Sequence, residues 1–211
     1  MNITTVGIIG AGTMGNGIAQ ACAVAGLHVV MVDISDAAVA RGLSTVAGSL
    51  DRLLKKDKIS AADRDAALAR IHGSTNYDEL KAAQLVIEAA TENFELKVKI
   101  LRQVDALLAP EVIIASNTSS ISITQLAAVT GRPDRFIGMH FFNPVPMMAL
   151  VEIIRGLQTS DATHEAVQAM ALALGKTPIT VKNAPGFVVN RILVPMINEA
   201  FFVLAEGLAS P

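Results

Sequence analysis

The sequence contains a single cysteine, Cys22, among its 211 residues, so no disulfide can form within the chain. Disulfides are typical of oxidising compartments, and one lone cysteine therefore favours a reducing compartment. The first residues enter an apolar run with neither a basic leader nor a small-residue cleavage pattern. We therefore expect a cytoplasmic protein.

Charge and long apolar runs are also scarce. Charged residues make up 17% of the chain, the formal net charge is −2, and no basic stripe is visible. This balance argues against nucleic acid as the main partner. No apolar run approaches the roughly 18–20 residues that span a bilayer, so we do not expect a membrane partner either. The chain is nevertheless 52% hydrophobic, which is enough for a globular domain with a substantial core.

Short β-branched runs alternate with longer Ala- and Leu-rich stretches, which is the pattern of a parallel α/β sheet. The expected strands are Thr5–Ile9, His28–Asp33, Arg70–Ser74, Leu85–Glu88, Val112–Ser116, Arg135–His140, Leu150–Ile154 and Thr177–Val181. The expected helices are Thr13–Ala25, Asp36–Lys55, Ala61–Ala69, Asn93–Leu108, Ile123–Ala128 and Asp161–Leu174. The pattern predicts a Rossmann-type, doubly wound and mostly parallel sheet.

The segment Asn183-Ala-Pro-Gly186 predicts a domain boundary, because Pro and Gly end one element before another helix begins near Phe187. We therefore expect one domain over residues 1–183 and the first helix of an all-helical domain over residues 184–211. This last helix, which runs to Leu204, has few polar residues and must be covered on several sides. Either another subunit covers it or the chain is a fragment without the rest of a helical domain, and we favour the fragment.

Gly10, Gly12 and Gly15 form a Gly-x-Gly-x-x-Gly motif between an expected strand and an expected helix. The first glycine permits a tight turn, the second lets the backbone approach a pyrophosphate, and the third allows close packing of helix on strand. The helix N-terminus then offers free N–H donors to phosphates. The glycines alone are a weak signal, because tight turns use glycine for steric reasons. Thr13 and Met14, inside the motif, belong to the same predicted cofactor site.

Asp33 strengthens the dinucleotide interpretation. It ends the second expected strand, where an acid accepts hydrogen bonds from the ribose hydroxyls of a dinucleotide. A carboxylate there would also repel a 2′-phosphate, so NAD is favoured over NADP. The alternative is that Asp33 belongs to the N-cap region of the following helix. Strand, glycines, helix and acid together predict nucleotide binding.

His140 is the candidate for the chemistry. It stands at the end of an expected strand, where open α/β sheets bind ligands, and a rigid turn with two prolines follows it. Oxidation of an alcohol needs a base for the hydroxyl proton, and histidine suits neutral pH. Glu152, on the next expected strand, would fix the tautomer of the ring if the two strands are neighbours. The hydroxyl-rich segment 116–120 by itself is typical of a polar turn.

Taken together, these motifs resemble those of the 3-hydroxyacyl-CoA dehydrogenase family, and most of all its bacterial 3-hydroxybutyryl-CoA members. The resemblance runs from Val6 through Glu206 and rests on segments 10–15, 116–120, 140–146 and 185–191. It implies reversible, NAD-dependent oxidation of an (S)-3-hydroxyacyl-CoA to the 3-ketoacyl-CoA. It also implies an acyl-CoA partner, no metal, and a homodimer for the full-length chain.

The resemblance assigns roles to the residues nearest the chemistry. It implies that His140 is the general base and that Glu152 orients it. Ser119 and Asn190 would hydrogen-bond the reacting oxygen or the thioester carbonyl, and Ser119 would also adjoin the nicotinamide. Asn190 lies on a very apolar helix, where a buried polar group needs a partner.

Further residues are implied at the two ends of the ligands. Glu92, Lys97 and Asn143 would line the nicotinamide half of the cofactor site. An ordinary exposed helix start is the alternative for Glu92 and Lys97. Ser49 and Lys56 correspond to family positions that contact coenzyme A, although a solvated helix face explains them as well.

Two other functions remain open at this stage. Dehydrogenases of free hydroxy acids or sugar acids share the nucleotide-binding fold. A non-catalytic dinucleotide-binding relative is the alternative from another class, and the combination of His140, Glu152, Ser119 and Asn190 argues against it. The sequence does not decide between butyrate metabolism, polyester synthesis and fatty-acid breakdown.

Overall fold

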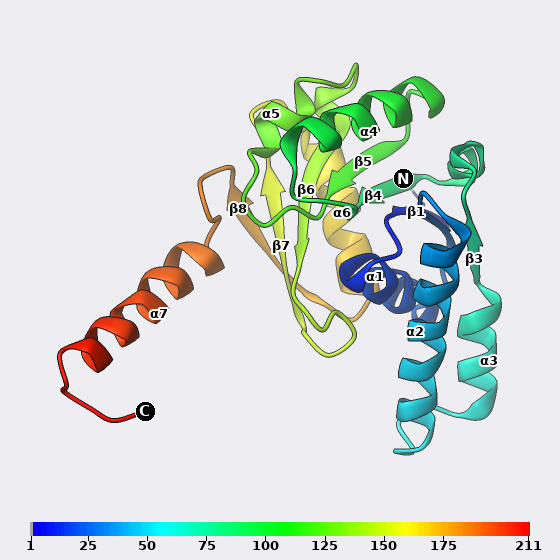
Figure 1. Cartoon of the computed structure of the whole chain (residues 1–211). Coiled ribbons are helices and arrows are strands. Elements are labelled where there is room, and N and C mark those ends of the chain that lie inside the picture. The colour runs from blue at the N-terminus through cyan, green and yellow to red at the C-terminus, as the bar shows by residue number, and fades with distance from the viewer. Residues whose placement is uncertain (1) are drawn as a thin grey trace.

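The computed structural model describes residues 2–211. Eight strands form one sheet in the order β3-β2-β1-β4-β5-β6-β7-β8, with helices on both of its faces (Figure 1). The strands are β1 (Thr5–Ile9), β2 (His28–Val32), β3 (Ile71–Ser74), β4 (Leu85–Glu88), β5 (Ile113–Ser116), β6 (Phe136–Phe141), β7 (Leu150–Arg155) and β8 (Thr177–Lys182). The helices are α1 (Thr13–Val24), α2 (Asp36–Leu54), α3 (Ala61–Ala69), α4 (Phe94–Leu107), α5 (Ile123–Ala127), α6 (Asp161–Ala173) and α7 (Val189–Ala205).

This architecture confirms the predicted Rossmann-type sheet. Every expected strand is present, and its ends differ from the prediction by at most one residue. The last helix begins at Val189 rather than near Phe187, because Phe187 has a positive φ of 50° that is incompatible with a right-handed helix. Two 3₁₀ helices, Tyr77–Ala82 and Pro133–Arg135, were not predicted, since such short turns have no apolar periodicity.

Strand order creates the crevice for a ligand. The strand order changes direction between β1 and β4, because the chain leaves β1 toward β2 and leaves β4 toward β5. Open α/β sheets bind ligands at such a switch point, outside the carboxyl ends of the strands. All neighbouring strands are parallel except β6 and β7, which pair antiparallel.

The side chains of each strand point alternately to the two faces of the sheet, and this alternation divides the core into two layers. Ile8 of β1 packs in the layer that α1, α2, α3 and α6 cover. The next residue, Ile9, points to the opposite face and packs in the layer beneath α4 and α5. Because successive side chains of a strand point to opposite faces, a nearly continuous apolar strand fills both layers.

Helix α7 extends away from the sheet, and the C-terminus lies beyond its far end (Figure 1). The structure describes the whole of α7, and none of its residues is buried. Its exposed large apolar side chains are Ile192, Leu193, Val194, Met196, Ile197, Phe201, Phe202 and Leu204. An apolar surface of this extent is typical of a protein–protein contact. Within residues 2–211, no helix is both long and apolar enough to cross a membrane.

Cys22 lies on the buried face of α1, and burial raises the pKa of its thiol to about 12. Because the thiolate is the reactive form, we expect iodoacetamide to leave native Cys22 unlabelled at about pH 8 and to label it in denaturant. The unfolded chain can ionise the thiol above its ordinary pKa of 9.0, whereas the native chain cannot. The contribution of the Cys22 thiol to the free energy of unfolding is therefore fully present below pH 9.0, and it is lost as the pH rises toward 12. Mass spectrometry measures the labelling, and equal labelling of native and denatured protein would contradict the burial.

Candidate active site

The three glycines of the turn after β1 are under different steric constraints. Gly10 has a φ of +101°, and a Cβ atom there would lie 2.8 Å from the carbonyl oxygen of Ala89. At Gly15 a Cβ atom would lie 1.7 Å from the carbonyl oxygen of Gly10, so only glycine lets α1 approach the turn. At Gly12 nothing lies within 4 Å of such an atom. Sterics of the fold therefore explain Gly10 and Gly15, but Gly12 faces open space.

Two hollows meet at Gly12 and Thr13, where the glycine motif predicts the pyrophosphate of a dinucleotide. The smaller has a cavity volume of about 240 Å³ and is also lined by Met14, Ala89, Ala90, Thr91, Glu92, Lys97 and Asn117. The larger has about 470 Å³ and is also lined by Ala11, Asn16, Asp33, Ile34, Ser35, Ala38, Arg41, Gly42 and Thr45. Gly12 is the N-cap of α1 and has no side chain to bond the first amides of that helix. Those amides are therefore available to a pyrophosphate placed between the two hollows.

Asp33 is held rigidly at the edge of the larger hollow. Its Oδ2 accepts a hydrogen bond from the Ala11 amide at 2.6 Å, and its Oδ1 accepts one from the Ile34 amide at 2.7 Å. The cap of α2 is Ser35, whose hydroxyl accepts from the Ala38 amide at 3.2 Å. The bond that caps α2 is therefore made by Ser35 and not by Asp33, whose remaining lone pairs can accept ribose hydroxyls.

Gly12 and Gly15 offer a matched test of the cofactor site. Gly12→Ala should leave the melting temperature nearly unchanged but weaken NADH binding by tenfold or more, since its methyl group occupies the pyrophosphate position; we take about 1.4 kcal/mol as the minimum loss. Gly15→Ala should instead destabilise the fold, because its methyl group collides with the turn. Thermal denaturation and NADH fluorescence titration measure the two effects. Loss of stability in the Gly12 variant, or normal binding by it, would contradict this assignment.

His140 and Glu152 face each other across the antiparallel pair. They are register partners on β6 and β7, and His140 Nδ1 lies 2.7 Å from Glu152 Oε2. His140 is 6% exposed and Glu152 is fully buried. The other carboxylate oxygen, Oε1, accepts from the amides of Val188 and Val189 at 2.9 and 3.0 Å, immediately before and at the start of α7. These bonds offset the burial of the carboxylate and connect it to the last helix.

Two aromatic rings hold the imidazole in place. The ring of Phe142 packs against His140 at a centroid distance of 4.5 Å, and that of Phe187 packs at 5.8 Å. With Nδ1 directed at Glu152, Nε2 is the ring nitrogen that remains for a ligand. No local sequence pattern predicts the contact of Phe187 with His140, because it joins segments that are distant in the chain.

Ser119, Asn190 and Glu92 form a second cluster. Glu92 Oε1 accepts from the Ser119 amide at 2.9 Å and from the Ser119 hydroxyl at 3.2 Å. Glu92 Oε2 accepts from the Thr118 hydroxyl at 2.7 Å. The Asn190 amide donates from Nδ2 to the Ser119 carbonyl oxygen at 3.4 Å. The fold therefore brings together three of the predicted site residues. It adds Thr118, which by sequence alone is typical of a polar turn.

These features coincide with a family assignment. Residues 5–184 match the model of the NAD-binding domain of 3-hydroxyacyl-CoA dehydrogenases. Residues 186–211 match the model of the C-terminal domain of the same enzymes. The chain belongs to the 3-hydroxyacyl-CoA dehydrogenase family. It is thus an NAD-dependent oxidoreductase that acts on 3-hydroxyacyl-CoA, as the motifs predict.

Similar proteins agree with this assignment. A 3-hydroxybutyryl-CoA dehydrogenase of Bradyrhizobium diazoefficiens is 50% identical over 208 residues, which are 99% of this chain and 71% of that protein. A probable 3-hydroxybutyryl-CoA dehydrogenase of Bacillus subtilis is 46% identical over all of this chain and 74% of its own length. The crystal structure of (S)-3-hydroxybutyryl-CoA dehydrogenase from Ralstonia eutropha is 76% identical, with a TM-score of 0.97 over this whole chain and 74% of that one.

Lys97 of the dehydrogenase contributes to the lining of the smaller hollow, but its side chain is 1% exposed and its ammonium group is paired. Its Nζ lies 2.5 Å from Oε2 of Glu88, which also accepts from the Ser116 hydroxyl at 2.8 Å. Glu88 Oε1 accepts from the Ala90 amide at 2.9 Å. The alternative of an exposed helix start is therefore wrong for Lys97, whereas Glu92 is exposed. Glu88 is not among the predicted site residues. The feature of the sequence that could have revealed it is a lone acidic residue at the end of an otherwise apolar strand.

Three predicted residues of the dehydrogenase stay apart from these clusters. Asn143 is exposed in the loop after β6, Ser49 lies on α2, and Lys56 is exposed just beyond the end of α2. In the part of the chain that the structure describes, no side-chain hydrogen bond joins them to His140 or Ser119. Figure 1 shows α2 and α7 on opposite sides of the molecule. An extended ligand would be needed to connect α2 with the imidazole.

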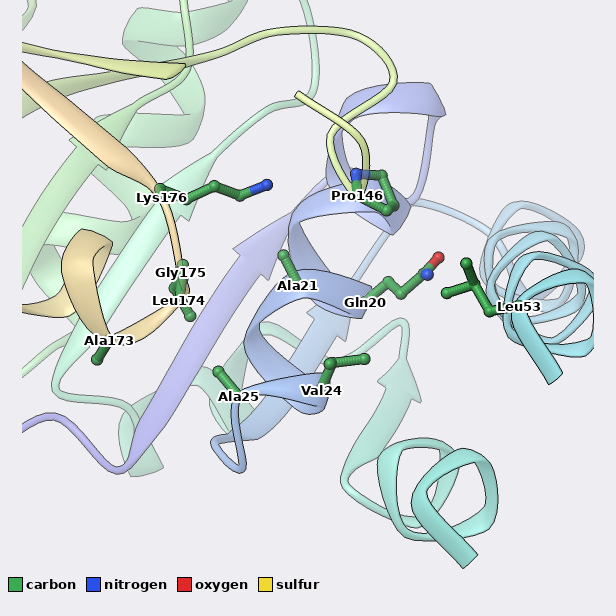
Figure 2. Close-up of a pocket in the computed structure, with 10 residues that line it drawn as sticks. All are labelled: Gln20, Ala21, Val24, Ala25, Leu53, Pro146, Ala173, Leu174, Gly175 and Lys176. Atoms are coloured by element: carbon green, nitrogen blue, oxygen red, sulfur yellow. The ribbon is translucent and has the colours of Figure 1, made fainter. Parts of the chain in front are cut away.

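Another cavity, of about 240 Å³, lies between α1, the end of α2 and the turn before β8 (Figure 2). None of the predicted site residues lines it. Lys176 points into this region and donates from Nζ to the carbonyl oxygens of Val145 at 2.6 Å and Met148 at 2.9 Å. Burial lowers the pKa of the Lys176 ammonium group. Lys176 therefore ties β8 to the loop that follows His140.

Proposed function

We propose that this dehydrogenase interconverts (S)-3-hydroxybutyryl-CoA and acetoacetyl-CoA, with NAD⁺ and NADH as the redox pair, and so acts in butyrate or fatty-acid metabolism. The observation that carries the proposal is the buried pair of His140 and Glu152 beside a dinucleotide crevice. The names of the similar proteins support the four-carbon acyl chain. In the oxidation, the C3 hydrogen leaves as hydride, the hydroxyl loses its proton, and a carbonyl bond forms.

His140 receives the hydroxyl proton in this scheme. NAD⁺, when bound, supplies the carbon that accepts the hydride. In the neutral tautomer whose Nδ1 hydrogen donates to Glu152, Nε2 has a lone pair that accepts the proton of the substrate. The carboxylate then stabilises the imidazolium that results, without itself becoming protonated. In the reverse direction the same imidazolium returns the proton to the oxygen.

Ser119 and Asn190 stabilise the oxygen on which negative charge develops during ketone reduction. Their support is the hydrogen bond that the Asn190 amide donates to the Ser119 carbonyl oxygen, which holds the two residues side by side. Two neutral donors aimed at a developing oxyanion lower the barrier without binding the neutral ground state equally well. Glu92 accepts from the Ser119 amide and so positions that residue. The single hydroxyl hydrogen of Ser119 is donated to Glu92 in this structure, so the hydroxyl must exchange Glu92 for the substrate oxygen in order to donate to it.

Asn143 completes the nicotinamide end of the cofactor site, together with Glu92 and Lys97. Ser49 and Lys56 hold the coenzyme A end of the substrate. Lys56 is an exposed cation close to the end of α2, which suits the phosphates of coenzyme A. Because α2 would bind the coenzyme A portion of the substrate, we expect a strong preference for thioesters over free acids.

The test is an NADH-oxidation assay with acetoacetyl-CoA, longer 3-ketoacyl-CoA esters and free acetoacetate. We expect the highest kcat/KM for acetoacetyl-CoA and at least about a hundredfold lower value for free acetoacetate, because the free acid cannot reach the coenzyme A contacts. Equal turnover of acetoacetate would favour a dehydrogenase of free hydroxy acids. NADH binding without turnover of any substrate would favour a non-catalytic relative.

We further propose that the full-length protein, whose relatives extend beyond the residues matched here, acts as a homodimer in the cytoplasm. The exposed apolar side chains of α7 support an association between copies, and the buried, unpaired Cys22 supports a reducing compartment. Light scattering after size exclusion of the full-length protein should give twice its chain mass, and Ile192→Glu with Phe201→Glu should reduce it to one chain mass. A monomer at all concentrations would contradict the dimer, and recovery in a membrane or periplasmic fraction would contradict the location.

A further inference from the structure

The larger hollow of the cofactor site contains charges of both signs. Asp33 lies at the end of β2, and Arg41 lines the same hollow from the second turn of α2. The Arg41 side chain is exposed. Arginine ion pairs within residues 2–211 are formed by Arg64, Arg132 and Arg155, so no carboxylate of these residues lies within 4 Å of the Arg41 guanidinium. Arg41 is thus a cation without a protein counter-ion in a ligand-binding hollow.

The surroundings of Arg41 suit a phosphate group. Ser35, Thr45 and Asn16 line the same hollow. The Thr45 hydroxyl already donates to the Arg41 carbonyl oxygen at 2.8 Å and the Asn16 amide to that of Gly12 at 2.7 Å, so the Ser35 hydroxyl is the side chain that can add a donor to the Arg41 guanidinium. The hollow also lies at the N-terminal end of α2, where the helix dipole favours negative charge. A guanidinium donates to phosphate oxygens in a bidentate geometry, which a lysine cannot reproduce.

Asp33 acts in the opposite direction. Both of its oxygens are held by backbone amides, so the carboxylate cannot turn away from the ribose. A fixed negative charge at this place repels a 2′-phosphate and accepts a 2′-hydroxyl. The Asp33 side chain thus accounts both for the repulsion of a 2′-phosphate and for the binding of a 2′-hydroxyl. Arg41, on α2, lines the same hollow.

We propose that Arg41 is a specificity-determining residue of the cofactor site. It provides the contact for the 2′-phosphate of NADP, and the carboxylate of Asp33 alone keeps the dehydrogenase selective for NAD. Removal of that one charge therefore exposes a phosphate site that the fold already contains. The inference concerns the adenosine half of the cofactor, so it does not depend on the proposed acyl substrate.

The test measures the dissociation constants of NADH and NADPH by nucleotide fluorescence, without any substrate. Asp33→Asn should tighten NADPH binding by about tenfold, the effect of one charge-assisted contact freed from repulsion. Adding Arg41→Met should abolish that gain and leave NADH binding within about twofold. Arg52→Met, an exposed arginine of the same helix outside the hollow, is the matched control and should change neither constant.

A second variant guards against misfolding, because Asp33→Asn alters the acceptors of two backbone amides. Arg41→Met in the otherwise native chain keeps those bonds and should weaken NADPH binding severalfold more than NADH binding. Equal weakening of NADH and NADPH would place Arg41 on the adenine or the shared phosphates and overturn the proposal. No change in either constant would overturn it as well.

Discussion

His140→Gln is expected to lower kcat for acetoacetyl-CoA reduction by about a thousandfold, within the range of general acid–base catalysis. The glutamine side chain occupies a similar volume but cannot carry a proton to or from the substrate. NADH affinity should stay within about twofold, because His140 lines neither of the two hollows that meet at Gly12 and Thr13. Steady-state NADH absorbance gives kcat, and fluorescence titration gives the dissociation constant.

His28→Gln is the matched control for this experiment. His28 is exposed at the start of β2, at the opposite end of the strands from the crevice. Its replacement should change neither kcat nor NADH binding. If His140→Gln retained turnover like the native chain, another group would have to move the proton, and the assignment of His140 and Glu152 would be wrong.

Lys97→Met is expected to lower the free energy of unfolding by about 3–5 kcal/mol, the cost of leaving one member of a buried ion pair alone. The substitution keeps the volume but strips Glu88, which is fully buried, of its cation. The loop that carries Ala90 and Glu92 should loosen as well, since Glu88 holds the Ala90 amide. NADH binding should therefore weaken together with stability, and urea denaturation and fluorescence titration measure the two.

The exposed Lys99 on the same helix provides the control, because Lys99→Met should change the free energy of unfolding by less than about 0.5 kcal/mol. Combining Lys97→Met with Glu88→Gln should restore part of the loss, since no isolated charge then remains buried. Equal stability of the Lys97 and Lys99 variants would mean that the ion pair does not contribute to the fold.

Local sequence patterns were enough to predict the strands, most helices and the parts of the site that neighbouring residues form. Apolar periodicity depends only on neighbouring residues, and it predicted each strand to within one residue. The glycine turn and Asp33 were readable for the same reason, since a tight turn and a strand-end acid are local features. His140 was recognisable from the rigid turn after it, and its role from the family resemblance.

Contacts between side chains that are distant in the sequence became known from the folded arrangement. The antiparallel register of β6 and β7 sets His140 opposite Glu152, and burial pairs Glu88 with Lys97 rather than exposing the lysine to solvent. Arg41 could be linked to the cofactor only once α2 was placed beside the turn that carries Gly12. These contacts depend on the order of the strands and on the low polarity of the interior, where each charge needs a partner. A local sequence pattern contains neither the strand order nor the identity of the partner.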